Sequence, residues 1–224
     1  MGHEKEDREY LKDEIRREFQ LERMVLFSDA VFAIVITLMA IEIHIPESVR
    51  FKNSEDLSHE LIMLLPNIIA YAASFFYIGY TWYQHLQVFS LLKDYDKGLV
   101  IRNLVMLFFV GFFPFGASII ARPNNGMFLI ILIYFLIIIL SKGAQLVLHH
   151  YILVKRPGLR INSDITDELI SFKKSRFVMI MLLVMFALVT TTTELIEDPA
   201  MKAFAWWWFF PFPFLLKYFQ KKIK

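Results

Sequence analysis

The amino-acid sequence predicts an all-α membrane protein with six transmembrane helices per subunit and both termini in the cytoplasm. Of its 224 residues, 57% are hydrophobic, and the mean hydropathy is +0.49. Soluble domains contain roughly 45–50% apolar residues. The other two observations are six apolar runs, each long enough to cross about 30 Å of hydrocarbon as a helix, and a one-sided distribution of Lys and Arg.

The six predicted spans are separated by polar connections rich in Pro, Asn, Asp and Lys. Pro66 is expected in an early turn of the second span, and Pro211 and Pro213 are expected to kink or end the sixth, because proline lacks a backbone N–H. We place the spans near residues 24–45, 60–85, 99–120, 127–152, 177–196 and 200–219.

The positive charges orient these spans. Eighteen of the 24 Lys and Arg residues lie before the first span, in alternate connections and after the sixth, and only four lie on the other side. Because cytoplasmic loops carry the positive excess, both termini are predicted to be cytoplasmic. The remaining two, Arg102 and Lys142, are expected to extend from within spans toward the cytoplasmic surface.

This organisation gives three predicted parts: a charged cytoplasmic segment, 1–23; a six-helix transmembrane domain, 24–219; and a basic cytoplasmic tail, 220–224. Residues Glu4–Glu22 read as a solvated helical extension with interspersed charges. No short apolar region with a cleavage site precedes the first span, so we expect that span to act as the insertion signal.

Composition also excludes several classes of function. With no cysteine, the chain has no disulfide, thiolate metal site or Cys nucleophile. The net charge of +2 gives no electrostatic case for nucleic acid. Since no metal-ligand cluster or Ser/His/Asp arrangement recurs at one depth, we expect neither an enzyme nor a bound cofactor.

The first span carries two polar residues near its start, Ser28 and Asp29, which we call the polar corner, and a separate apolar face. On a helical wheel with Ile34 at 0°, Leu38 and Ile41 fall within about 40°, whereas Ser28 and Asp29 lie near 120° and 220°. An acid in a membrane helix costs roughly 2.5–3.5 kcal/mol on insertion scales, so it usually has a partner. The apolar stripe by itself is typical of lipid contact or helix packing.

Partners for the polar corner are available at the same depth. The second span ends with Trp82 and His85, and the third begins with Arg102 and Asn103. These side chains supply hydrogen-bond donors for a buried carboxylate, and a connected network would clamp the helices. The alternative is a proton relay or sensor through Asp29 and His85.

The residues Arg23, Phe27, Ser28 and Asp29, followed by AVFAIVITLMAIEI, resemble the first-span signature of the transmembrane protein 175 potassium channel family. Prokaryotic members carry one six-helix repeat. The segments containing Trp82, His85 and Asn103 are similar to the family's partners for that motif. The resemblance implies a homotetramer whose first helices line a central pore without a reentrant filter. It implies an apolar constriction, which maps onto Ile34, Leu38 and Ile41.

The function implied is a potassium-preferring cation channel of a prokaryotic plasma membrane, with other copies of the chain, potassium ions and the lipid bilayer as partners. An apolar ring gates by dewetting and favours ions that lose water easily. Thr37 is a possible pore hydroxyl, although a threonine in a membrane helix often bonds back to its own backbone. Glu42 and His44 near the outer mouth are further candidates. The alternative is a proton-coupled or secondary cation transporter using Asp29 and His85.

Overall fold

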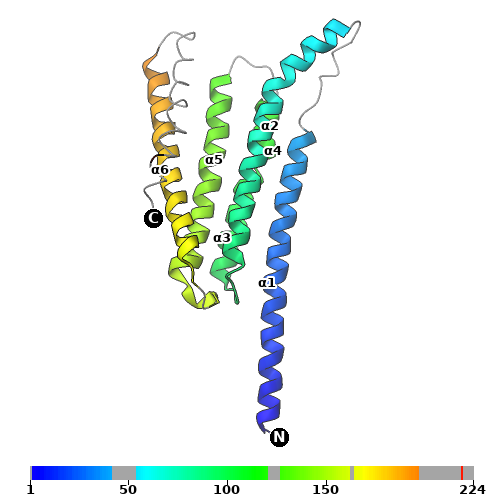
Figure 1. Ribbon diagram of the computed structural model, residues 1–224, viewed down its shortest axis with the longest axis vertical. Helices are drawn as coiled ribbons and strands as arrows, with labels where there is room; N and C mark the ends of the chain where they lie inside the picture. Colours follow the sequence, from blue (N-terminus) through cyan, green and yellow to red (C-terminus); the bar gives the residue numbers. More distant parts are fainter. Residues whose placement is uncertain (1, 42–53, 121–126, 162–163, 197–217, 219–224) are drawn as a thin grey trace.

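The computed structural model describes residues 2–41, 54–120, 127–161, 164–196 and 218. Apart from an isolated bridge between Leu92 and Arg160, the regular structure of these residues is helical (Figure 1). The elements are α1 (Gly2–Ile41), α2 (Ser54–Phe89), α3 (Lys97–Val110), α4 (Phe113–Ile120), α5 (Met127–His150), the π-helix η1 (Tyr151–Lys155), the 3-10 helix η2 (Pro157–Leu159) and α6 (Thr166–Leu195).

Four helical ranges in the described part are long and apolar enough to cross a membrane, which makes the chain an all-α membrane protein. They are Glu14–Ile41, Lys97–Ile119, Leu129–Lys155 and Thr166–Leu195. These ranges overlap four of the predicted spans, and α2 contains the predicted second span. The predicted sixth span, with Pro211 and Pro213, lies outside the described residues.

The predicted third span is not one continuous helix. α3 ends at Val110, Gly111 forms its C-cap, and α4 begins at Phe113. Glycine has low helix propensity, and Pro114 has no N–H with which to continue the ladder of hydrogen bonds. The two residues together explain the break, which the sequence prediction missed.

The start of α2 also differs from the prediction. α2 begins at Ser54 and runs to Phe89, so Pro66 lies in the helix interior rather than in an early turn. A proline there removes one backbone hydrogen bond and favours bending, and α2 bends toward its N-terminal end in Figure 1. α1 passes through residues 23 and 24 without interruption, so the charged segment and the first span form a single helix.

The bundle is organised around α5, which contacts α3, α4 and α6, while α1 contacts α2, α3 and α4. The main apolar core joins Phe32, Val35 and Met39 of α1 to Met106 of α3 and Leu148 of α5. A second cluster packs α5 against α6. Three buried side chains therefore fix which face of α1 points into its own subunit.

At the end of the bundle nearest the N-terminus, two connections lie side by side. We call residues 90–96 and 156–161 the loop pair. Lys93 donates its backbone N–H to the carbonyl of Leu159 at 2.9 Å, and Ile161 donates to Leu91 at 2.8 Å. These bonds hold the α2–α3 connection against the segment that follows α5.

Candidate functional site

A buried hydrogen-bonded chain joins the first three helices beside the FSD sequence. Ser28 of α1, His85 of α2 and Asn103 of α3 are each at most 1% exposed. Asn103 donates from Nδ2 to Ser28 Oγ at 2.8 Å, and Ser28 Oγ donates to the carbonyl of Met24 at 2.9 Å. His85 Nε2 lies 3.0 Å from Asn103 Oδ1. The amide of Asn103 therefore bridges α1 and α2.

The network also assigns the tautomer of His85. Asn103 Oδ1 can only accept, so Nε2 carries the proton and donates it. The other ring nitrogen, Nδ1, is buried without a hydrogen-bond partner in the described residues. The ring stacks on Phe89 at 3.8 Å between centroids and meets the edge of Phe32 at 5.8 Å. The imidazole is therefore enclosed by aromatic rings and fully buried.

Asp29 lies outside this chain. Its Oδ1 accepts a hydrogen bond from the Trp82 indole Nε1 at 2.8 Å, and Trp82 is 38% exposed. No hydrogen bond joins Asp29 to His85 among the described residues, so the pair considered for a relay is not directly connected. The expected single cluster is instead two: a buried Ser28–Asn103–His85 chain and a more exposed Asp29–Trp82 pair.

Arg102 does not join either cluster, which corrects the expectation that it serves the polar corner. Its guanidinium lies 4.0 Å from the centroid of the Tyr151 ring, and its Nη1 donates to the carbonyl of Gly98 at 2.8 Å. The reason is helical: adjacent residues on α3 point about 100° apart. With Asn103 facing α1 and α2, Arg102 faces Tyr151 at the start of η1.

Arg23 and Phe27 lie on an open side of α1. Arg23 Cζ is 5.8 Å from the ring of Phe19, one turn away, and Phe27 is 52% exposed. With Tyr95 and Asn103, both residues line a cavity of about 320 Å³. Within the motif, Arg23 and Phe27 therefore face outward, whereas Ser28 faces the core.

The predicted apolar stripe of α1 is left exposed by the described part of its own subunit. Ile34, Leu38 and Ile41 are 55%, 45% and 70% exposed. Val35, one position along and about 100° around the helix, is 4% exposed, and Met39 is 1% exposed. The stripe is therefore free to meet something other than the core of this subunit.

Thr37 lies on the same exposed side. Its Oγ1 is 3.1 Å from the carbonyl oxygen of Ala33 and 2.9 Å from that of Ile34. The hydroxyl has one proton to share between these acceptors, and its lone pairs remain available. Glu42 and His44 lie outside the described residues.

Sequence reasoning missed a buried lysine. Lys142 of α5 is 5% exposed, and its Nζ donates to Gln84 Oε1 at 2.8 Å and to Gln145 Oε1 at 2.9 Å. Gln84 continues to Ser175 Oγ of α6 at 3.1 Å. The expected extension of Lys142 toward the surface is wrong, because two amide oxygens satisfy the ammonium inside the bundle. The sequence did offer a signal for this site: Gln84 and Gln145 interrupt apolar runs, and polar side chains inside membrane spans usually face the bundle interior and pair with one another.

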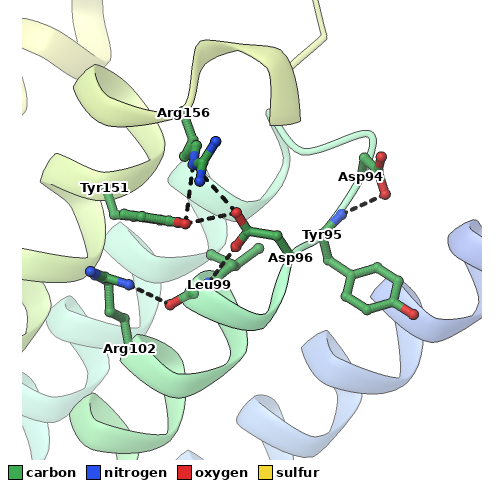
Figure 2. Close-up of polar contacts among 8 residues, drawn as sticks. Asp94, Tyr95, Asp96, Leu99, Arg102, Tyr151 and Arg156 are labelled. Atoms are coloured by element: carbon green, nitrogen blue, oxygen red, sulfur yellow. Dashed lines mark hydrogen bonds and ion pairs between the residues drawn. The ribbon is translucent and has the colours of Figure 1, made fainter.

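The loop pair is fixed by a second polar cluster, drawn in Figure 2. Asp96 caps α3 by accepting from the Leu99 N–H at 2.7 Å and also accepts from Tyr151 Oη at 2.7 Å. Arg156 Nε lies 3.3 Å from Tyr151 Oη and 3.5 Å from Asp96 Oδ2. Although partial burial works in the opposite direction, the bonds from Tyr151 and Leu99 and the nearby guanidiniums lower the pKa of Asp96 below its ordinary value. The cluster ties the start of α3 to the end of α5.

These observations define a class: a helical membrane protein whose first helix combines a buried polar anchor with an uncovered apolar stripe. The family described as endosomal/lysosomal potassium channel TMEM175 matches residues 23–114, the part that contains the anchor and the stripe. Through these residues the chain is similar to the TMEM175 family.

Relatives and a solved structure show the same similarity. A potassium channel of Streptomyces collinus is 37% identical over 100 residues, which cover 45% of this chain and 47% of that protein. A potassium channel of Chamaesiphon minutus is 35% identical over 100 residues, covering 45% and 49%. The human endosomal/lysosomal proton channel TMEM175 is 33% identical over 98 residues, covering 42% and 19%. The aligned part of the chain thus spans about half the length of the bacterial relatives.

The crystal structure of a lysosomal potassium-selective channel TMEM175 homolog from Chamaesiphon minutus has the same fold. The TM-score is 0.67 with 24% identity, covering 92% of this chain and 98% of that one. At this sequence identity, the structural similarity shows a shared fold only. It extends the agreement from the matched first half to nearly the whole chain.

Proposed function

We propose that the protein is a potassium-preferring cation channel of a prokaryotic plasma membrane, formed by four copies around a central pore lined by α1. Each copy contributes six spans with both termini in the cytoplasm. The relatives from Streptomyces collinus and Chamaesiphon minutus are named potassium channels. The family match over residues 23–114 includes the part of α1 from residue 23 to Ile41, which is the proposed pore lining.

The observation that carries the proposal is the contrast between neighbouring residues of α1. Ile34, Leu38 and Ile41 are exposed, whereas Phe32 and Val35 are at most 4% exposed. A stripe of large apolar residues that the described residues of its subunit do not cover faces lipid, another copy or a pore. One α1 helix cannot enclose a pore, so a channel requires several copies related by cyclic symmetry.

In this arrangement Ile34, Leu38 and Ile41 form successive apolar rings. Such rings offer no oxygens to replace the hydration shell of an ion, so they gate by dewetting. Potassium sheds water more easily than sodium, which gives a modest preference without a carbonyl filter. Thr37 adds hydroxyl oxygens between the rings. The Ser28–Asn103–His85 chain holds α1 at a fixed rotation, which keeps the stripe aimed at the axis.

The test is planar-bilayer recording of the purified protein under a potassium/sodium gradient. Unitary current steps with a reversal potential toward that of potassium are expected. Saturable, slow flux without steps would instead favour a proton-coupled or secondary transporter using Asp29 and His85. The alternative has less support in the geometry, because these two residues are not hydrogen-bonded to each other in the described part of the chain and His85 is enclosed by Phe32 and Phe89.

A further inference from the structure

The N-terminal half of α1 carries a row of bases in line with the apolar stripe. On the helical wheel that places Ile34 at 0°, Lys12, Arg16 and Arg23 all fall within about 40° of it. The three side chains are exposed. Because α1 is one uninterrupted helix from Gly2 to Ile41, these bases and the stripe lie along one side of the same helix. We call Lys12, Arg16 and Arg23 the basic row.

Within the described residues, no ion pair joins the basic row to an acid. The acids in this half of α1 whose side chains the structure describes, Glu14, Glu18 and Glu22, point about 120–160° away from the stripe. Two of them line the cavity of about 620 Å³ between α1 and the loop pair. The base that does pair is Arg17, whose Nη1 lies 3.5 Å from Asp94 Oδ2. The basic row therefore keeps its positive charge unpaired in the subunit.

Most of the basic row lies beyond the reach of lipid headgroups. The apolar part of α1 begins at Met24, and the lower half of the helix projects beyond the ends of α3, α5 and α6 in Figure 1. At 1.5 Å per residue, Arg16 lies about 12 Å and Lys12 about 18 Å beyond Met24. The headgroup region of one leaflet is only about 5–8 Å thick. Arg23 therefore stands at the level of the headgroups, whereas Arg16 and Lys12 extend into water.

In the proposed assembly the basic rows of all copies face one shared space. The apolar stripe faces the central axis there, and the bases lie on the same side of the same helix, so each copy turns its basic row toward that axis. Like charges gathered around an axis repel one another and attract anions. Since the described acids of this half of α1 point away from the axis, the counter-charge comes from anions dissolved in the cytoplasm.

We propose that the basic rows of several copies together form a cytoplasmic binding site for a multivalent phosphate anion at the inner mouth of the pore. The inference rests on the proposed function, which places the stripe of every copy around one axis. Two of the three bases are arginines, and a guanidinium binds two phosphate oxygens at once. Lys12 and Arg16 are four residues apart, so their side chains are neighbours on one face of the helix. Because the site lies in the path of the cations, its occupancy changes the electrostatic potential that they meet.

Isothermal titration calorimetry of the purified full-length protein in phosphatidylcholine nanodiscs tests the site, with inorganic triphosphate as the probe. The matched variants are Arg16→Gln and Arg17→Gln. Each removes one positive charge at the same height of α1, but Arg17 points about 100° away from the stripe side. Arg16→Gln should weaken triphosphate binding by about tenfold or more, and Arg17→Gln by less than about twofold. Equal weakening by both variants would overturn the site, because it would show a general effect of charge.

The stoichiometry of the same titration tests whether the copies share the anion. A site on the axis binds fewer triphosphates than there are chains, and its affinity falls as the KCl concentration rises, because salt screens exposed charges. One triphosphate bound to each chain would overturn the shared site. Arg16→Lys keeps the charge and should retain most of the affinity, which separates the loss of charge from a loss of folding. An Arg16→Lys variant as weak as Arg16→Gln, with both correctly assembled, would contradict an electrostatic site.

Further outcomes separate this site from lipid binding and from the channel. Nanodiscs that contain a minority of phosphatidylglycerol should still bind triphosphate; if binding is lost there, the bases belong to lipid headgroups and the site for a dissolved anion is overturned. Unitary potassium currents without triphosphate binding would refute the anion site and leave the channel intact. Shared triphosphate binding by a protein without unitary currents would support the site and refute the channel. A monomeric mass in mild detergent would refute both proposals together.

Discussion

Asn103→Ala tests whether the buried chain beside α1 holds the helices together. Asn103 is 1% exposed and bridges Ser28 Oγ at 2.8 Å and His85 Nε2 at 3.0 Å. Its removal leaves the buried imidazole without a hydrogen-bond partner in the described residues, since Nδ1 already lacks one. A buried polar group left without a partner costs about 1–3 kcal/mol. Ser28 loses one accepted bond worth about 1 kcal/mol but still donates to Met24. The expected total is roughly 2–4 kcal/mol.

Ser28→Ala is the matched comparison. It removes the same Asn103–Ser28 bond and leaves the buried Nδ2 of Asn103 without that acceptor, but it keeps Asn103 on His85, so it should cost about 1–3 kcal/mol, less than Asn103→Ala. We expect Asn103→Ala to lower the melting temperature in mild detergent by roughly 5–15 °C, and Ser28→Ala by a few degrees. The assay is thermal unfolding followed by tryptophan fluorescence and by the fraction of intact oligomer. Equal losses for the two variants, or a larger loss for Ser28→Ala, would refute the bridging role of Asn103.

Three further outcomes are expected. Ile34→Asn should raise conductance and weaken the preference for potassium over sodium, whereas Val35→Asn should change permeation far less and mainly reduce stability; single-channel recordings with the opposite order would mean that another face lines the pore. Asp29→Ala should cost only about 1 kcal/mol in thermal unfolding, because its indole partner is partly exposed, and a loss as large as that of Asn103→Ala would contradict the separation of the two clusters. Asp96 has a lowered pKa, so its contribution is complete above the ordinary value of 3.8 and disappears as pH falls through the lower folded value. Wild type should therefore lose stability below about pH 4 relative to Asp96→Asn, and parallel acid unfolding curves would argue against this.

The hydrophobic pattern is sufficient to find the helices. A span is a local property: about 20 apolar residues bury their own backbone hydrogen bonds in lipid whatever surrounds them. The same locality explains why a helical wheel alone separates Ile34 from Val35, since successive side chains of any α-helix point about 100° apart. The family resemblance of Arg23, Phe27, Ser28 and Asp29 is also readable from the sequence, and the match over residues 23–114 supports it.

Interruptions of a helix are less predictable. Both Pro66 and Pro114 remove a backbone hydrogen bond, yet α2 continues through the first and the chain breaks just before the second. The difference at Pro114 is the preceding Gly111, which adds a second weak position within the same turn. Whether a helix survives a proline depends on the packing around it, and packing is not a local property.

What the sequence by itself determined, for the described residues, is therefore where the long apolar helices lie, their membrane character and which residues of α1 share a face. Only the tertiary structure decided which polar groups pair. Trp82, His85, Arg102 and Asn103 were all reasonable partners for Asp29 by depth. A step of one residue along α3, however, turns the side chain from η1 to α1 and α2. Asn103 therefore reaches Ser28 and His85, while Arg102 reaches Tyr151. Lys142 was expected at the surface and is satisfied inside by Gln84 and Gln145, residues 58 and 3 positions away. Hydrogen bonds depend on position to within an ångström, and that position is set by helices that meet only after folding.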